Sequence, residues 1–265
     1  MKLNAGRAGL MITVAGWITF TLLLVNNGIN ITTAASQTIA SSPMYTTKPL
    51  NVTLKNTNQT LTAPSYSILK TGREWSYVSK SQGISPSFVP PLTDLKGDYG
   101  NWLEDKRIQP LVQPHLEQFI QDAAKANLPV LISSAYRSAE SQEKVRKDMA
   151  NTGASNKDIE EYVAKPGHSE HQLGLAVDLT SYSEACKASF AACKLDDKTA
   201  DWLAKHAHEY GFILRYPKGK EAITGVGYES WHFRYVGKKL AEVIHESGLT
   251  FDEVYRELVQ HRQSS

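Results

Sequence analysis

The chain has 265 residues, of which 41% are hydrophobic, and this length allows one large domain or two small ones. Its formal net charge of +2 is too small to indicate an electrostatic partner, and no lysine and arginine cluster with interleaved aromatic residues occurs. We therefore expect no nucleic-acid partner. The charge is unevenly distributed, because the first acidic residue in the chain is Glu74.

An apolar segment near the amino terminus, residues 8–25, follows the basic residues Lys2 and Arg7. Its length is just sufficient to span a bilayer, and the basic flank would stay in the cytoplasm. Residues 1–30 are therefore predicted to be a membrane anchor, or a signal segment that is cleaved near Ala35. In either case we expect the rest of the chain to lie outside the cytoplasm, in the cell envelope or secreted.

The next segment, residues 31–66, is rich in asparagine, threonine and serine and contains few large apolar side chains. Such a composition buries too little apolar surface to offset the entropy lost when the chain becomes ordered. We expect this segment to be a flexible tether. The folded domain is then predicted to occupy residues 67–265.

The folded domain is predicted to mix helices with short strands. Apolar residues at three- and four-residue spacing after Pro114 indicate a helix, and the β-branched run 130–136 indicates a buried strand. Ser138 can cap a helix over residues 139–149. Further expected elements are a short helix starting at Ser155 and Asp158, a strand over 174–180, a helix from Asp197 to Gly211, strands within 212–216 and 231–236, and a last helix capped by Thr250 and Glu253. Because these elements do not alternate regularly, the predicted fold class is α+β, with a small, mostly antiparallel sheet flanked by helices.

The predicted strand 174–180 carries a carboxylate that a core strand does not need. Its leucine and valine side chains point to one face, and Asp178 points to the other. A charge in such a strand requires a partner. His171 lies seven residues earlier, and Gly174 permits a turn that would bring the two side chains together.

A later loop and strand offer two more groups, Glu229 and His232. Two imidazoles, one carboxylate and one spare glutamate are the parts of a catalytic zinc site with one open tetrahedral position, where the glutamate can take a proton from water. The same four side chains could instead form a hydrogen-bonded core cluster. Spacing alone does not separate these two interpretations.

Two motifs sharpen the prediction: Ser169-x-His171-x-x-Gly174-x-Ala176-x-Asp178 and Glu229-x-Trp231-His232. Together they resemble the signature of the zinc D-alanyl-D-alanine carboxypeptidases of the VanY type. The segment SAYRSAESQ, residues 134–142, is similar to the Tyr-Arg-Ser-x-x-x-Gln segment of that family. The resemblance extends over about residues 90–235.

The resemblance implies a role for each matching residue. His171, Asp178 and His232 would bind Zn²⁺, Glu229 would be the general base, Arg137 and Gln142 would line the substrate pocket, and Ser169 would border it. It implies a D,D-carboxypeptidase that removes the C-terminal D-Ala from peptidoglycan stem peptides, and we expect a monomer. An L,D-carboxypeptidase or a D,D-dipeptidase on the same zinc centre stays open, as does a non-catalytic module that binds peptidoglycan.

The two cysteines, Cys186 and Cys193, are close in sequence and lie in the part of the chain that we expect to be exported. An oxidising compartment favours a disulfide between them, and their spacing matches no zinc motif. We expect a bond that holds the loop 181–196 in place and takes no part in the chemistry.

Overall fold

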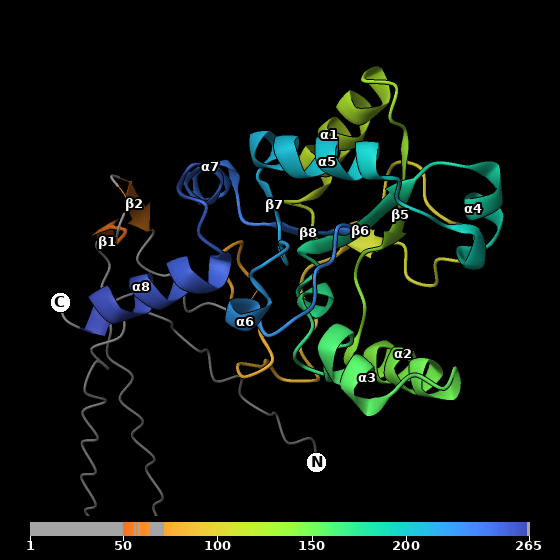
Figure 1. Ribbon diagram of the computed structural model, residues 1–265, viewed down its shortest axis with the longest axis horizontal. Coiled ribbons are helices and arrows are strands. Elements are labelled where there is room, and N and C mark those ends of the chain that lie inside the picture. Colours follow the sequence, from red (N-terminus) through yellow and green to blue (C-terminus); the bar gives the residue numbers. More distant parts are fainter. Residues whose placement is uncertain (1–49, 56, 58, 64–71, 264–265) are drawn as a thin grey trace, which may run out of the picture. The chain divides into compact units, whose positions relative to one another are not determined.

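The computed structural model describes residues 50–55, 57, 59–63 and 72–263 (Figure 1). The predicted anchor or signal segment, residues 1–30 with its apolar run 8–25, lies outside these residues. Within the described ranges, no helix combines the length and the hydropathy needed to cross a membrane.

A four-stranded sheet forms the centre of the fold. Its order is β5 (Val130–Ser134), β6 (Ala176–Ser181), β8 (His232–Tyr235) and β7 (Phe212–Leu214), and each neighbouring pair is antiparallel. The predicted α+β class with a small antiparallel sheet is therefore confirmed. Strand β6 lies between β5 and β8, so a side chain on β6 can meet groups from both neighbours.

The two faces of the sheet have different surroundings. Helices α1 (Gln113–Lys125) and α5 (Asp197–His206) lie on one side, and α2 (Ala139–Asn151) and α3 (Asn156–Tyr162) lie on the other (Figure 1). The main core lies on the first side, where Phe119 stacks on Tyr210 and Phe212. Leu175, Val177 and Leu179 are fully buried in this core, as their alternation predicts. Asp178 consequently points to the opposite face.

The other elements between residues 72 and 263 surround this core. They are β3 (Thr93–Asp94) paired with β4 (Arg107–Ile108), the 3₁₀ turns η1 (Glu170–Leu173), η2 (Phe190–Ala192) and η3 (Ala207–Tyr210), and the helices α4 (Glu184–Ala188), α6 (Glu221–Thr224), α7 (Lys238–Ser247) and α8 (Phe251–Gln263).

Three helix starts are fixed by the side chains that the sequence suggests. The Ser138 side chain accepts a hydrogen bond from a backbone N–H in the first turn of α2. Ser155 and Asp158 form a reciprocal capping box at α3, and Thr250 and Glu253 do the same at α8. These caps satisfy N–H groups that a helix leaves without intrahelical partners.

The predicted tether requires a correction over its last part. Strands β1 (Leu50–Thr53) and β2 (Thr60–Ala63) form an antiparallel hairpin inside residues 31–66. Val52, Leu54 and Leu61 are buried against apolar side chains of α7 and α8. These few apolar residues suffice because the helices supply the rest of the cluster, so the domain boundary expected at residue 67 leaves out a folded hairpin.

Candidate metal centre

Three side chains converge on the α2 and α3 side of the sheet. Asp178 on β6 lies directly opposite His232 on β8 in the strand register. His171 comes from the turn η1, and Gly174 ends that turn in the left-handed region at φ +64°. Asp178 Oδ1 lies 2.9 Å from His232 Nδ1, and Asp178 Oδ2 lies 3.3 Å from His171 Nε2. One potential ligand atom from each residue lies within 4.8 Å of the others.

The donor set fits a zinc ion. Each histidine turns one ring nitrogen toward Asp178 and the other toward a protein acceptor. Nδ1 of His171 lies 2.7 Å from the Ala135 carbonyl oxygen, and Nε2 of His232 lies 3.5 Å from Glu170 Oε2. Metal-binding histidines commonly donate their second N–H to a carbonyl or carboxylate in this way. Two imidazoles and one carboxylate leave a fourth tetrahedral position for water or substrate.

The electrostatics of the three residues also suit a cation. Burial alone would raise the pKa of Asp178, but the charge of His171 and hydrogen bonds from both histidines lower it below its usual range. Burial lowers the pKa of His171. For His232, burial lowers the pKa, but the hydrogen bond to Asp178 and the nearby Glu170 carboxylate outweigh it and raise the pKa to about 9. Asp178 is therefore ionised, and a cation can take the place of the proton on His232.

Glu229 lies beside this group on the loop before β8. Its backbone N–H donates to the Tyr216 carbonyl, and its Oε2 lies 3.8 Å from Nδ1 of His232. Burial raises the pKa of Glu229 to about 7, although the charge of His232 partly opposes this. A carboxylate with a pKa near neutrality can both accept and return a proton at physiological pH.

All seven residues predicted for the metal and substrate sites line one cavity of about 500 Å³. They are His171, Asp178, His232, Glu229, Arg137, Gln142 and Ser169. Arg137 is held next to the candidate ligand His171, because its backbone N–H donates a hydrogen bond to the His171 carbonyl. Its guanidinium Nε is buried and finds no hydrogen-bond partner within the described part of the chain. A buried donor of this kind suits an anionic ligand.

Gln142 and Ser169 lie in the same wall of the cavity, and both form hydrogen bonds with the backbone. The Gln142 side chain is buried, and its Nε2 donates to the Ala164 carbonyl, while its Oε1 has no partner among the described residues. The Ser169 hydroxyl accepts a hydrogen bond from the His171 N–H and so caps η1. Ser169 therefore shapes the turn that carries a candidate ligand.

Comparison with known proteins identifies the family. The VanY family model, described as D-alanyl-D-alanine carboxypeptidase, matches residues 105–238, slightly more than half of the chain. The chain belongs to the VanY family. The matched segment contains every residue of the candidate metal centre.

Three relatives illustrate the range of the VanY family. The putative carboxypeptidase YodJ of Bacillus subtilis is 34% identical over 186 residues, which are 68% of this chain and 66% of the relative. The structure of the LdcB LD-carboxypeptidase matches with a TM-score of 0.60 and 30% identity, over 71% of this chain and 87% of that one. A VanY D,D-pentapeptidase in complex with Zn(II) matches with a TM-score of 0.56 and 30% identity, over 68% and 97%. The match thus spans just under two thirds of the length of the curated relative.

One buried carboxylate of this VanY-family site was missed by sequence reasoning. Glu170 is 2% exposed, and its Oε1 accepts hydrogen bonds from Arg215 Nε and Arg234 Nη1 at 2.9 and 2.8 Å. Burial alone would raise the pKa of Glu170, but the charges of the two arginines lower it below its usual range. The sequence feature that could have pointed to Glu170 is Arg234. It lies on the same face of β8 as His232, and a buried arginine requires an anion as its partner.

The disulfide loop reaches the VanY-family cavity through Phe190. Cys186 and Cys193 form a disulfide with an S–S distance of 1.99 Å. The Trp102 indole Nε1 donates to the Cys186 carbonyl at 2.8 Å, and its ring contacts Phe190 edge-on. Phe190 is 64% exposed and lines the cavity, so the disulfide loop supplies an apolar edge to the site.

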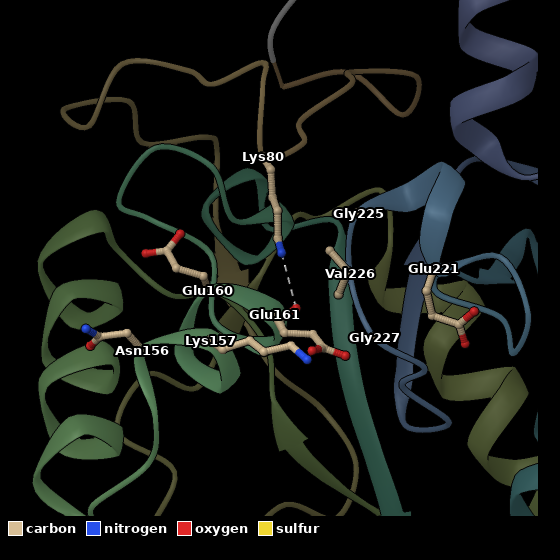
Figure 2. Close-up of a pocket in the computed structure, with 9 residues that line it drawn as sticks. All are labelled: Lys80, Asn156, Lys157, Glu160, Glu161, Glu221, Gly225, Val226 and Gly227. Atoms are coloured by element: carbon tan, nitrogen blue, oxygen red, sulfur yellow. Dashed lines mark hydrogen bonds between the residues drawn. The ribbon is translucent and has the colours of Figure 1, made fainter.

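A second depression of about 540 Å³ adjoins the cavity (Figure 2). Lys80, Glu161 and Val226 line both hollows, and Lys80 Nζ donates to the Glu161 carbonyl. The predicted site residues do not line this depression, whose walls carry Lys157 and Glu221. The VanY-family cavity therefore adjoins a charged, open surface.

Proposed function

We propose that the protein is a zinc-dependent D,D-carboxypeptidase that removes the C-terminal D-Ala from peptidoglycan stem peptides. One observation carries this proposal. A single cavity holds a His-Asp-His donor set, a buried glutamate outside that set, and an arginine whose buried Nε has no partner among the described residues. Membership of the VanY family supports the same assignment.

The metal would be held by His171, Asp178 and His232. When bound, Zn²⁺ polarises the scissile carbonyl and lowers the pKa of a water molecule at the open position. The chain orients the two imidazoles through the Ala135 carbonyl and the Glu170 carboxylate. The ligand geometry is thus fixed by groups that are buried and hydrogen-bonded, which limits its rearrangement when a substrate enters.

Glu229 would transfer the protons. Its Oε2 lies 3.8 Å from His232 Nδ1, and from there it would reach a water molecule held between itself and the substrate carbonyl. It would accept a proton from the attacking water and then donate it to the amine of the departing D-Ala. Burial, which raises the pKa of Glu229, helps this carboxylate to hold the proton between the two transfers.

Arg137 would make the enzyme an exopeptidase. A planar guanidinium can bind both oxygens of a C-terminal carboxylate, and peptides without that group would leave the buried donor unsatisfied. Gln142 lines the same wall, and its Oε1, which has no partner in the described part of the chain, can accept a hydrogen bond from substrate. Substrate positioning, rather than proton transfer, is the role of both residues.

A peptidoglycan substrate would require the folded domain to lie outside the cytoplasm, in the cell envelope. Residues 8–25 would then act as the membrane anchor, or as the core of a signal segment that is removed near Ala35. The disulfide between Cys186 and Cys193 agrees with an oxidising compartment. Detection of the intact chain in isolated membranes, by mass spectrometry of its amino-terminal peptide, distinguishes the anchor from the cleaved form.

An L,D-carboxypeptidase is the second candidate, because the LdcB LD-carboxypeptidase has a TM-score of 0.60 with this chain. Incubating the purified protein with pentapeptide and tetrapeptide stems separates the two. D,D-activity converts the pentapeptide to tetrapeptide plus D-Ala, and L,D-activity converts the tetrapeptide to tripeptide plus D-Ala. Release of two alanines from free D-Ala-D-Ala would indicate a dipeptidase. Binding of the stems without any product would contradict an enzymatic role.

A further inference from the structure

His232 is held between two carboxylates that approach opposite sides of its ring. Nδ1 lies 2.9 Å from Asp178, inside the candidate metal group, and Nε2 lies 3.5 Å from Glu170 Oε2. The ring is further confined by Tyr216 and His171, whose ring centroids lie 5.1 and 4.9 Å away. The orientation of His232 is therefore set from both sides, and Glu170 lies outside the candidate ligand set.

Glu170 is itself fixed, but through only one of its oxygens. Arg215 and Arg234 both donate to Oε1, and all three side chains are at least 98% buried. Arg215 also donates to both oxygens of Asp252, at the start of α8. The carboxylate is thus unable to swing away from His232 without breaking two buried charged hydrogen bonds.

The second oxygen of Glu170, Oε2, faces Nε2 of His232. Oε2 of Glu170 and Nε2 of His232 are both buried and lack a hydrogen-bond partner among the residues that the structure describes. Unsatisfied buried polar atoms are rare because each carries a desolvation cost. A shift of about 0.6 Å brings their separation from 3.5 Å to the usual N–H···O distance of about 2.9 Å.

We propose that Glu170 is a positioning residue of the metal centre, which accepts the Nε2 proton of His232 and so leaves Nδ1 as the metal-binding nitrogen. This inference rests on the proposed zinc centre and adds one residue that determines the affinity of the site for zinc. His171 has the opposite arrangement, since its Nδ1 is paired with the Ala135 carbonyl and its Nε2 faces the ligands. The two imidazoles thus present different nitrogens to the same ion.

Glu170→Gln tests the inference because the substitution keeps the shape of the side chain. Arg215 and Arg234 both donate, so the amide would present its oxygen to them and its NH₂ to His232. The amide NH₂ and the Nε2–H of His232 would then face each other as two donors. This contact disfavours the tautomer that is protonated at Nε2 and leaves Nδ1 for the metal. We expect the zinc dissociation constant, measured by competition with a chromophoric chelator, to rise about 10–100-fold.

Asp252→Asn is the matched control. It also removes one buried carboxylate that pairs with Arg215, but Asp252 contacts no ligand in the described structure. Zinc affinity should stay within about threefold of wild type, while both variants lower the melting temperature. Equal zinc affinity in Glu170→Gln and wild type overturns the inference, and so does an equal loss in both variants.

A measurement on the wild-type protein covers the case in which a variant does not fold. Nitrogen-15 spectra of zinc-loaded protein with labelled histidine should show His232 protonated at Nε2 and bare at Nδ1. The reverse tautomer for His232 refutes the role of Glu170 whatever the variants do. A wild-type protein that binds no zinc contradicts the proposed function itself, so the two failures are distinguishable.

Discussion

Replacing Glu229 with glutamine separates proton transfer from metal binding. Glutamine keeps the size of the side chain and its hydrogen-bonding capacity, but it removes the basic carboxylate. Because Glu229 lies outside the candidate ligand set, the zinc content should be unchanged. The rate of the chemical step should fall about 10²–10⁴-fold, the usual contribution of a positioned proton-transfer group, which corresponds to roughly 3–5 kcal/mol in the barrier.

The same substitution should stabilise the metal-free protein at high pH. Burial raises the pKa of Glu229 from 4.5 to about 7, so the folded state holds this proton more tightly than the unfolded chain does. Stability is therefore lost as the pH rises from about 4.5 through about 7, and the full cost is about 3 kcal/mol at 1.36 kcal/mol per unit. Glutamine carries no such proton and avoids this cost.

Urea unfolding of the chelator-treated proteins at pH 5 and pH 8 measures the effect. The glutamine variant should exceed wild type by up to about 3 kcal/mol at pH 8, and the difference should shrink toward pH 5. Glu117→Gln, a half-buried glutamate of α1 outside the cavity, is the matched control and should change neither turnover nor this pH dependence. Near-normal turnover of zinc-loaded Glu229→Gln would show that the general base is another group. A stability difference that is independent of pH would refute the burial argument.

Three further predictions address the other residues of the site. A double variant, His171→Ala with His232→Ala, should lose stoichiometric zinc by metal analysis, and retention of the metal would contradict the ligand set. Arg137→Ala should raise KM more than it lowers kcat and reduce the preference for a free C-terminal carboxylate over an amidated peptide, whereas an unchanged preference would exclude its role. Cys186 and Cys193 should give no signal in thiol labelling of the unreduced protein, and reduction should lower stability by about 2 kcal/mol, the value expected for closing so short a loop, without loss of the metal.

The ligand positions could be predicted because they depend on short-range rules. The alternation along β6 places Asp178 opposite the leucine face, and Gly174 provides the left-handed residue that ends η1. Helix caps such as Ser155 are likewise local and appear where the sequence indicates them. The meeting of β6 with His232 is not local: the residue types alone left it open, and the resemblance to a known family favoured it.

The parts that sequence reasoning missed depend on contacts between distant segments. The hairpin at residues 50–63 has a sparse apolar pattern, and its burial depends on α7 and α8, almost two hundred residues further along the chain. Glu170 reads as an ordinary charged residue until Arg215 and Arg234 are found around it. Composition and periodicity contain no information about such pairings, because each charge on its own favours the surface.

The two arginines beside Glu170 make the family-matched segment, residues 105–238, dependent on residues outside it. Arg234 donates to the backbone carbonyls of Glu74 and Ser76, which precede that segment, and Arg215 pairs with Asp252, which follows it. A chimaera that transplants residues 105–238 into another host would leave two buried guanidinium groups short of acceptors. Moving this segment into an unrelated host therefore requires both flanks as well.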